Sequence, residues 1–194
     1  EEIAVFANQV EDGAKAIRDH LGEYVDQQGG NDRKLEIFLA SDSPGPRVTA
    51  AHEPWIFIPV TMVPIEMTPY LHEMVHVLAQ WSWRRSEWAA EGFANHVAAA
   101  VLPTIDGYHR SYILREGLNQ LQQHRCSEEG AVVLPLVGVG GRRGTYSAEY
   151  APLFQLTMGE RLKYAPPFYS LAWSFTDFIV DRYGIDGFHG IATA

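Results

Sequence analysis

Hydrophobic residues recur at helical spacing through the first part of the chain. Between residues 3 and 27 an apolar residue returns every three or four positions, at Ile3, Phe6, Val10, Ala14, Ile17 and Leu21. This spacing places the side chains on one face of an amphipathic helix. The glycine-rich residues 28–32 interrupt the pattern, and we expect the helix to end there.

Two short segments that follow are predicted to be strands. Residues 34–39 alternate between polar and apolar side chains, and residues 55–60 are rich in β-branched and aromatic side chains. The second segment is bounded by Pro54 and Pro59. Because proline lacks the N–H that a central strand donates, we expect this segment at the edge of a small mixed sheet.

Two helices are predicted next. Thr68 and Pro69 are a typical helix start, an N-cap followed by a first-position proline. Apolar residues then recur with helical periodicity at Leu71, Val75, Leu78 and Ala79. Ser86 is the expected N-cap of a second helix over residues 87–102.

The C-terminal half is predicted to be mainly helical. Residues 109–124 have a helical pattern, and residues 166–183 form a further helix that Gly184 ends. Between them residues 127–165 are mixed in composition. The glycine-rich residues 138–144 lack the Lys-Ser or Lys-Thr of a phosphate-binding loop, so we interpret them as an ordinary loop.

These elements together predict an α+β fold. We expect one domain over residues 1–194, with an N-terminal helix and sheet in residues 1–67 and a helical part in residues 68–194. The chain has 194 residues and is 46% hydrophobic. That length and composition are sufficient for one substantial core.

Charge and composition exclude several classes of partner. The net charge is −9 and the pI about 5.3, which argues against nucleic acid, because phosphates are bound by clustered Lys and Arg. No apolar run approaches the roughly 18 residues of a membrane span. The chain has 1 cysteine, Cys126, so it has no internal disulfide. Since it begins with Glu1 and not Met, we expect a trimmed or processed fragment, from an exported protein. The sequence gives no prediction of the oligomeric state.

The segment from residue 72 to residue 76 carries the most informative chemistry. Residues four apart lie on one face of a helix, so His72 and His76 can present two imidazole nitrogens to one metal ion. This His-Glu-x-x-His pattern is typical of zinc hydrolases, in which the glutamate is the general base. We therefore expect a Zn2+ cofactor, with Glu73 as the catalytic base.

A catalytic zinc ion needs a third protein ligand and an open position for water. On the predicted helix over residues 87–102, Glu91 and Asn95 are four residues apart and share one face. Glu91 is the predicted third ligand, because two histidines and a glutamate leave one coordination position free. His96 and Glu87 are the alternatives to Glu91.

The His-Glu-x-x-His pattern at 72–76 and the Trp-x-x-Glu-Gly-x-Ala pattern at 88–94 together resemble the gluzincin zinc metallopeptidases. That group contains the thermolysin-like peptidases and related aminopeptidases. Residues 68–100 carry the main resemblance, and residues 169–184 resemble the C-terminal helix of small bacterial domains of this kind. The resemblance implies a zincin-like fold and hydrolysis of peptide bonds in a peptide or protein substrate.

Carried over to this chain, the resemblance makes His72, His76 and Glu91 the metal ligands and Glu73 the general base. Asn95 stands where thermolysin-like relatives have an aspartate that accepts a hydrogen bond from a ligand histidine. An amide oxygen can accept the same bond and fix the histidine tautomer, but it adds no negative charge. We therefore predict that the Asn95 amide oxygen accepts a hydrogen bond from a ligand histidine and orients it.

Gluzincins often stabilise the developing oxyanion with a Tyr or His from a later helix, which satisfies the need for a donor at that position. Tyr169 is the predicted donor on this resemblance, with Tyr150 and His189 as alternatives. Zincin-like enzymes also align an extended substrate with an edge strand. That role would fall to residues 55–60.

Departures from the pattern narrow the subclass. No Gly-x-Met-Glu-Asn segment precedes residue 72, which disfavours an aminopeptidase and favours cleavage of internal bonds. Ala79 and Ser82 stand where a metzincin would need Gly and His. Two other functions stay open. One is a peptidase-like module that binds peptide or metal without catalysis, and the other is a zinc amidase that acts on a non-protein substrate.

Overall fold

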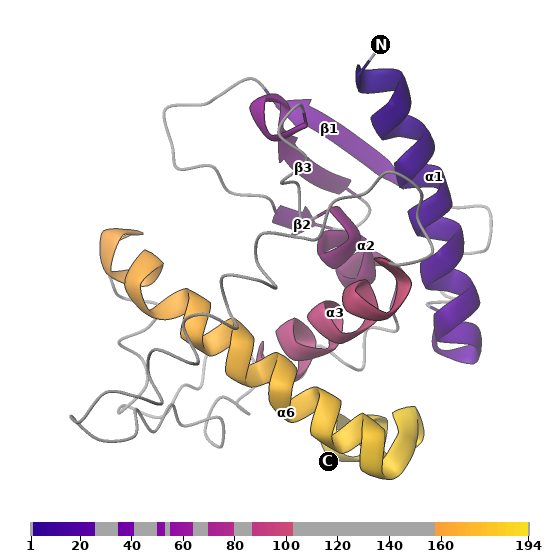
Figure 1. Cartoon of the computed structure of the whole chain (residues 1–194), viewed down its shortest axis with the longest axis vertical. Helices are drawn as coiled ribbons and strands as arrows, with labels where there is room; N and C mark the ends of the chain where they lie inside the picture. The colour runs from indigo at the N-terminus through magenta and orange to yellow at the C-terminus, as the bar shows by residue number, and fades with distance from the viewer. Residues whose placement is uncertain are drawn as a thin grey trace. The chain divides into compact units, whose positions relative to one another are not determined.

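The computed structural model describes residues 2–25, 35–40, 50–52, 55–63, 70–79, 87–102 and 158–193. These residues form helices and a small sheet, which is an α+β composition, as expected (Figure 1). The chain divides into two compact units. One of the three boundaries between the units falls inside a helix, between His96 and Val97.

The first unit begins with the helix α1, Glu2–Leu21, followed by a single 3-10 turn, Gly22–Tyr24. The buried face of α1 includes Phe6, Ile17 and Leu21, which belong to the predicted apolar stripe. The predicted end at residues 28–32 is wrong. Gly22 has a φ of 56°, a left-handed conformation that glycine adopts without cost, and such a residue commonly ends a helix.

Helix α1 packs against the helix α2, Tyr70–Leu78. The rings of Phe6 and Tyr70 meet edge to face, with centroids 5.4 Å apart. The Tyr70 hydroxyl donates a hydrogen bond of 3.3 Å to the Gln9 carbonyl oxygen. Gly13 allows this close approach, because a Cβ atom there would lie 2.7 Å from Leu71 Cδ2. The predicted cap residues, 68 and 69, lie outside the described residues, so the cap stays a prediction.

The sheet has three strands: β1, Glu36–Ala40; β2, Ala50–His52; and β3, Trp55–Pro59. Their order is β1-β3-β2, with β3 parallel to β1 and antiparallel to β2. The predicted mixed sheet is thus confirmed. The predicted edge position of residues 55–60 is wrong, because β3 is the central strand. Pro59 is the last residue of β3 and pairs with the last residue of β1, so its missing N–H affects only the end of the ladder.

The two faces of the sheet differ. Ile56 and Ile58 are fully buried, and α2 packs against β2 and β3. On the opposite face the rings of Phe38, Trp55 and Phe57 are partly exposed, and the Phe38 ring contacts the other two. This alternation of buried and exposed residues is the period of two that a strand imposes.

The second unit contains most of the helix α3, Glu87–Val101, and the helix α6, Met158–Thr193. The predicted bounds of α3 are confirmed to within one residue. Helix α6 contains the predicted helix over residues 166–183 but begins earlier. Gly184 interrupts it with φ 73° and ψ 176°, values that only glycine adopts readily, and a further helical segment over residues 185–193 follows.

Several predictions concern residues outside the described part of the chain. These are the helix over residues 109–124, the glycine-rich loop over residues 138–144 and most of the mixed region, residues 127–157. The remaining residues of the mixed region, 158–165, belong to α6. In the part that the structure describes, none of the helices is both long enough and apolar enough to cross a membrane.

Candidate metal centre

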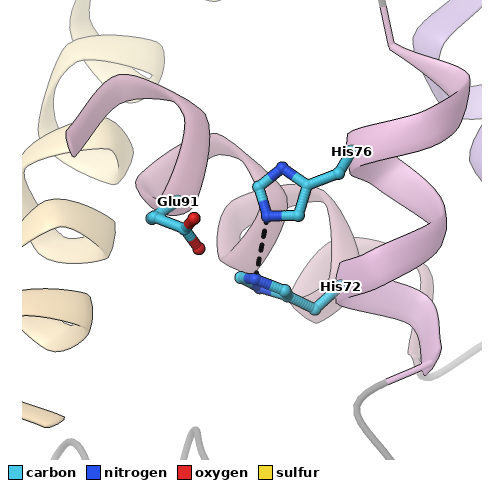
Figure 2. Close-up of side chains that lie close together, drawn as sticks. All are labelled: His72, His76 and Glu91. Carbon is cyan, nitrogen blue, oxygen red and sulfur yellow. Dashed lines mark hydrogen bonds between the residues drawn. The ribbon is translucent and has the colours of Figure 1, made fainter. Parts of the chain in front are cut away.

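His72 and His76 lie on successive turns of α2 and turn their rings towards each other (Figure 2). The two Nε2 atoms are 3.0 Å apart. The ring centroids are 4.7 Å apart and the ring planes are nearly perpendicular. His72 is buried and His76 is partly exposed. The predicted convergence of the two imidazoles is confirmed.

The packing of α2 explains why both rings take this direction. Leu71, Met74, Val75 and Leu78 are all buried. In a helix of about 3.6 residues per turn these four positions form one continuous stripe, and residues 72 and 76 fall on a different face. Because the stripe is anchored in the core, the rotation of α2 about its axis is fixed. The direction in which the His72 and His76 side chains leave α2 is therefore fixed as well.

Glu91 is the third member of the cluster. It lies on α3 and is partly buried. His72, His76 and Glu91 each offer one ligand atom, and these atoms all lie within 4.8 Å of one another. In Figure 2 the Glu91 carboxylate points towards the two rings. This group could hold a metal ion.

The donor set fits the geometry that a metal ion requires. Zinc binds histidine nitrogens and carboxylate oxygens at roughly 2.0–2.2 Å in a tetrahedron, so ligand atoms around it are about 3.4 Å apart. The separation of 3.0 Å between the two Nε2 atoms is close to that value. The other separations are no longer than 4.8 Å, so the Glu91 carboxylate would have to move closer to the two rings by up to about 1.4 Å to complete a tetrahedron. Two imidazoles and one carboxylate suit zinc and other late divalent first-row ions.

The contact between the two Nε2 atoms also has a chemical consequence. A neutral imidazole has one donor nitrogen and one acceptor nitrogen. Two Nε2 atoms at 3.0 Å form a hydrogen bond only if one of them carries the proton. A metal ligand must offer its lone pair. Metal binding at both Nε2 atoms would therefore replace the contact between His72 and His76, and each neutral imidazole would then carry its proton on Nδ1.

Glu73 and Asn95 are both buried, with 8% and 3% of their surfaces exposed. Glu73 follows His72 on α2 and is not a member of the three-residue group, as expected for a general base. Asn95 lies one helical turn after Glu91 on α3. Burial of an amide and a carboxylate requires polar partners. The predicted roles of both residues stay predictions.

Three residues are predicted as candidate oxyanion donors. Tyr169 belongs to α6, but its side chain lies outside the described residues, as does Tyr150. His189 lies in the segment over residues 185–193 and is partly exposed. The role of Tyr169 stays a prediction.

Of the two alternatives to Glu91, His96 is engaged elsewhere. Its Nδ1 lies 2.6 Å from the Asp177 Oδ1 on α6, and it is not a member of the metal-binding group. The side chain of Glu87 lies outside the described residues. Sequence patterns alone did not predict the contact of Asp177 with His96 or the close packing at Gly92. Gly92 carried a signal, since a glycine inside a helix often marks a close packing contact.

No protein-family model matches the chain, and no curated protein and no solved structure matches it. Its function must therefore be inferred from its own residues.

Proposed function

We propose that this protein is a zinc-dependent peptidase with a zincin-like fold that hydrolyses internal peptide bonds. The observation that carries the proposal is the group of His72, His76 and Glu91, with ligand atoms within 4.8 Å of one another. The group coincides with a His-Glu-x-x-His segment on a helix, the pattern typical of zinc hydrolases. Three protein ligands leave one coordination position for water, which distinguishes a catalytic zinc site from a structural one.

Zinc bound by these three side chains would lower the pKa of a water molecule and polarise the carbonyl of the substrate. Glu73 is the residue of the chain that moves the proton. Its carboxylate would accept a proton from the attacking water and deliver it to the nitrogen of the leaving amine. Glu73 suits this role because it is next to a ligand in sequence and is itself buried.

Two further residues would complete the site. Asn95, buried one turn after Glu91, would accept a hydrogen bond from a ligand histidine and hold its tautomer. The Tyr169 hydroxyl would donate a hydrogen bond to the oxygen that becomes negative in the transition state. The substrate would be a peptide or an unstructured protein segment.

A second function is favoured by one observation. Asn95 is an amide at a buried position where a carboxylate would strengthen the ligand histidine. A weaker metal site would suit a module that binds metal or peptide without cleaving it.

The test uses the whole chain, purified and loaded with one equivalent of zinc. We expect cleavage of casein at internal bonds, detected by mass spectrometry of the fragments, loss of cleavage with a chelator and recovery when zinc is added back. Zinc binding without cleavage of casein or of a peptide library would overturn the peptidase proposal in favour of the binding module. Cleavage of a non-peptide amide alone would make the protein an amidase. Failure to bind zinc would overturn the metal site itself.

A further inference from the structure

Helix α6 packs on the same stretch of α3 that carries Glu91. The Trp88 ring contacts the rings of Phe175 and Phe188, with centroids 5.1 and 6.2 Å apart. The Phe93 ring stacks on Phe188 at 5.2 Å. These contacts lie on either side of Glu91 in sequence. They join α3 to both the long part of α6 and the segment that follows Gly184.

The closest approach of the two helices is at Gly92, the residue after Glu91. A Cβ atom at this position would lie 2.4 Å from the Ala172 carbonyl oxygen and 2.4 Å from Thr176 Oγ1. Both Ala172 and Thr176 are fully buried. Because one of these contacts is to backbone, a side chain at residue 92 would separate the helices. Glycine therefore sets the distance between them.

A polar pair fixes the next turn. The His96 Nδ1 donates to the Asp177 Oδ1 at 2.6 Å. The His96 side chain is 14% exposed and the Asp177 side chain 40% exposed. A short hydrogen bond to a carboxylate is directional, unlike the ring contacts. The pair therefore restricts how α3 can slide or rotate along α6.

The position of these contacts around α3 relates them to Glu91. At about 100° per residue, Trp88, Gly92 and His96 lie at roughly 60°, 100° and 140° around the helix axis from Glu91. They form one strip along the helix. Holding this strip against α6 fixes the rotation of α3, and the rotation of α3 determines the direction of the Glu91 carboxylate.

We propose that His96 and Asp177 are positioning residues for the third metal ligand: their hydrogen bond locks α3 on α6 and thereby directs Glu91 towards the metal. The inference rests on the proposed metal site. Neither residue belongs to the ligand group, so both act through Glu91. Ordering a ligand in advance lowers the cost of binding. The pair should consequently change metal affinity.

The test is a double-mutant cycle on zinc affinity in the full chain, measured by competition with a chromophoric chelator. The proteins are wild type, His96→Ala, Glu91→Ala and the double variant. We expect His96→Ala to weaken zinc binding 10- to 100-fold, the range for residues that support a metal ligand. In the Glu91→Ala background the same substitution should have no further effect, because the residue through which His96 acts is gone.

Matched variants separate positioning from ligation and from folding. Asparagine places an N–H donor near the position of the histidine Nδ1, so His96→Asn should restore most of the affinity, whereas it would not replace a metal-bound imidazole. Asp177→Ala should reproduce the loss seen for His96→Ala. Asp181→Ala removes an exposed carboxylate one turn along α6 and should leave the affinity unchanged. Circular dichroism of the zinc-free proteins monitors folding.

The outcomes are distinct. Losses that add in the double variant, or wild-type affinity in Asp177→Ala, would overturn the positioning role while the metal site stands. A His96→Asn protein as weak as His96→Ala would also overturn it. If the wild-type protein binds no zinc, both the proposed metal site and this inference are wrong. Should His96→Ala unfold, Asp177→Ala replaces it in the cycle, because the 40% exposure of Asp177 means that its truncation leaves little cavity.

Discussion

The Nε2 atoms of His72 and His76 lie 3.0 Å apart on successive turns of α2. Two side chains that already converge lose little further freedom when an ion binds between them. The buried stripe of α2 maintains this arrangement, since it anchors the helix in the core. The chain therefore has two convergent imidazole nitrogens that could serve as preorganised metal ligands.

Removing either histidine should abolish tight zinc binding. We expect His72→Ala or His76→Ala to weaken binding by more than about 100-fold, beyond the range for residues that only support a ligand. Zinc content after dialysis, measured by mass spectrometry, checks the expectation. His20→Ala is the control, because His20 is exposed on α1 and its loss should leave the zinc content unchanged. Full zinc occupancy in His72→Ala would contradict ligation by this residue.

Glu73→Gln should separate metal binding from catalysis. The amide keeps the size of the side chain but cannot accept the water proton, so we expect zinc to be retained while kcat falls about 10²- to 10⁴-fold. Casein cleavage with zinc-loaded protein measures the effect. Glu11→Gln removes one negative charge at an exposed position of α1 and should be as active as wild type. An active Glu73→Gln protein would exclude Glu73 as the base.

Substitutions of Asn95 test whether this residue accepts a hydrogen bond from a ligand histidine. If its amide oxygen accepts a hydrogen bond from a ligand histidine, Asn95→Asp should raise zinc affinity, because a carboxylate makes the imidazole a stronger ligand. Asn95→Leu should lower the affinity about 10- to 100-fold. Competition titration of both variants provides the values. Equal affinities would show that Asn95 is only a packing residue. A buried carboxylate without a partner is costly, so an Asn95→Asp protein that melts early would also indicate a packing role.

The features that could be predicted from the sequence are those that local rules determine. Helix α3 was predicted over residues 87–102 and is Glu87–Val101, because its start and its apolar periodicity are local signals. The pairing of His72 with His76 follows from the four-residue spacing on one helix. Glu91 required more than spacing. It was assigned because a zinc ion needs a third ligand, and the structure brings the predicted residue to the other two.

The features that could not be predicted depend on contacts between distant segments. Asp177 meets His96 across 81 positions of sequence, and periodicity gives no information about which helices pair. Phe188 is fully buried against Phe93, although Gly184 was expected to end the helical part. The central position of β3 was missed for a similar reason. Its partner β2 has only three residues, too few to show alternation.

The close contact at Gly92 gives a prediction about stability. A Cβ atom there would lie 2.7 Å from the Ala172 carbonyl carbon, and backbone in a packed helix cannot give way cheaply. Overpacking of this kind costs about 1–3 kcal/mol, which exceeds the gain of up to about 1 kcal/mol from a better helix former. We expect Gly92→Ala to lower the free energy of unfolding, with a fall in Tm of about 2–4 °C per kcal/mol.

Gly190 provides the matched control, because a Cβ atom at that position would meet nothing within 4 Å. Gly190→Ala should stabilise the protein by about 0.5–1 kcal/mol, since alanine has less backbone entropy to lose than glycine. Thermal denaturation of both variants and of wild type compares the same substitution at a closely packed position, Gly92, and at an unobstructed one, Gly190. A Gly92→Ala protein that melts at or above the wild-type Tm would mean that α6 does not press on the turn that carries Glu91. In that event the role assigned to the His96 and Asp177 pair would lose its structural basis.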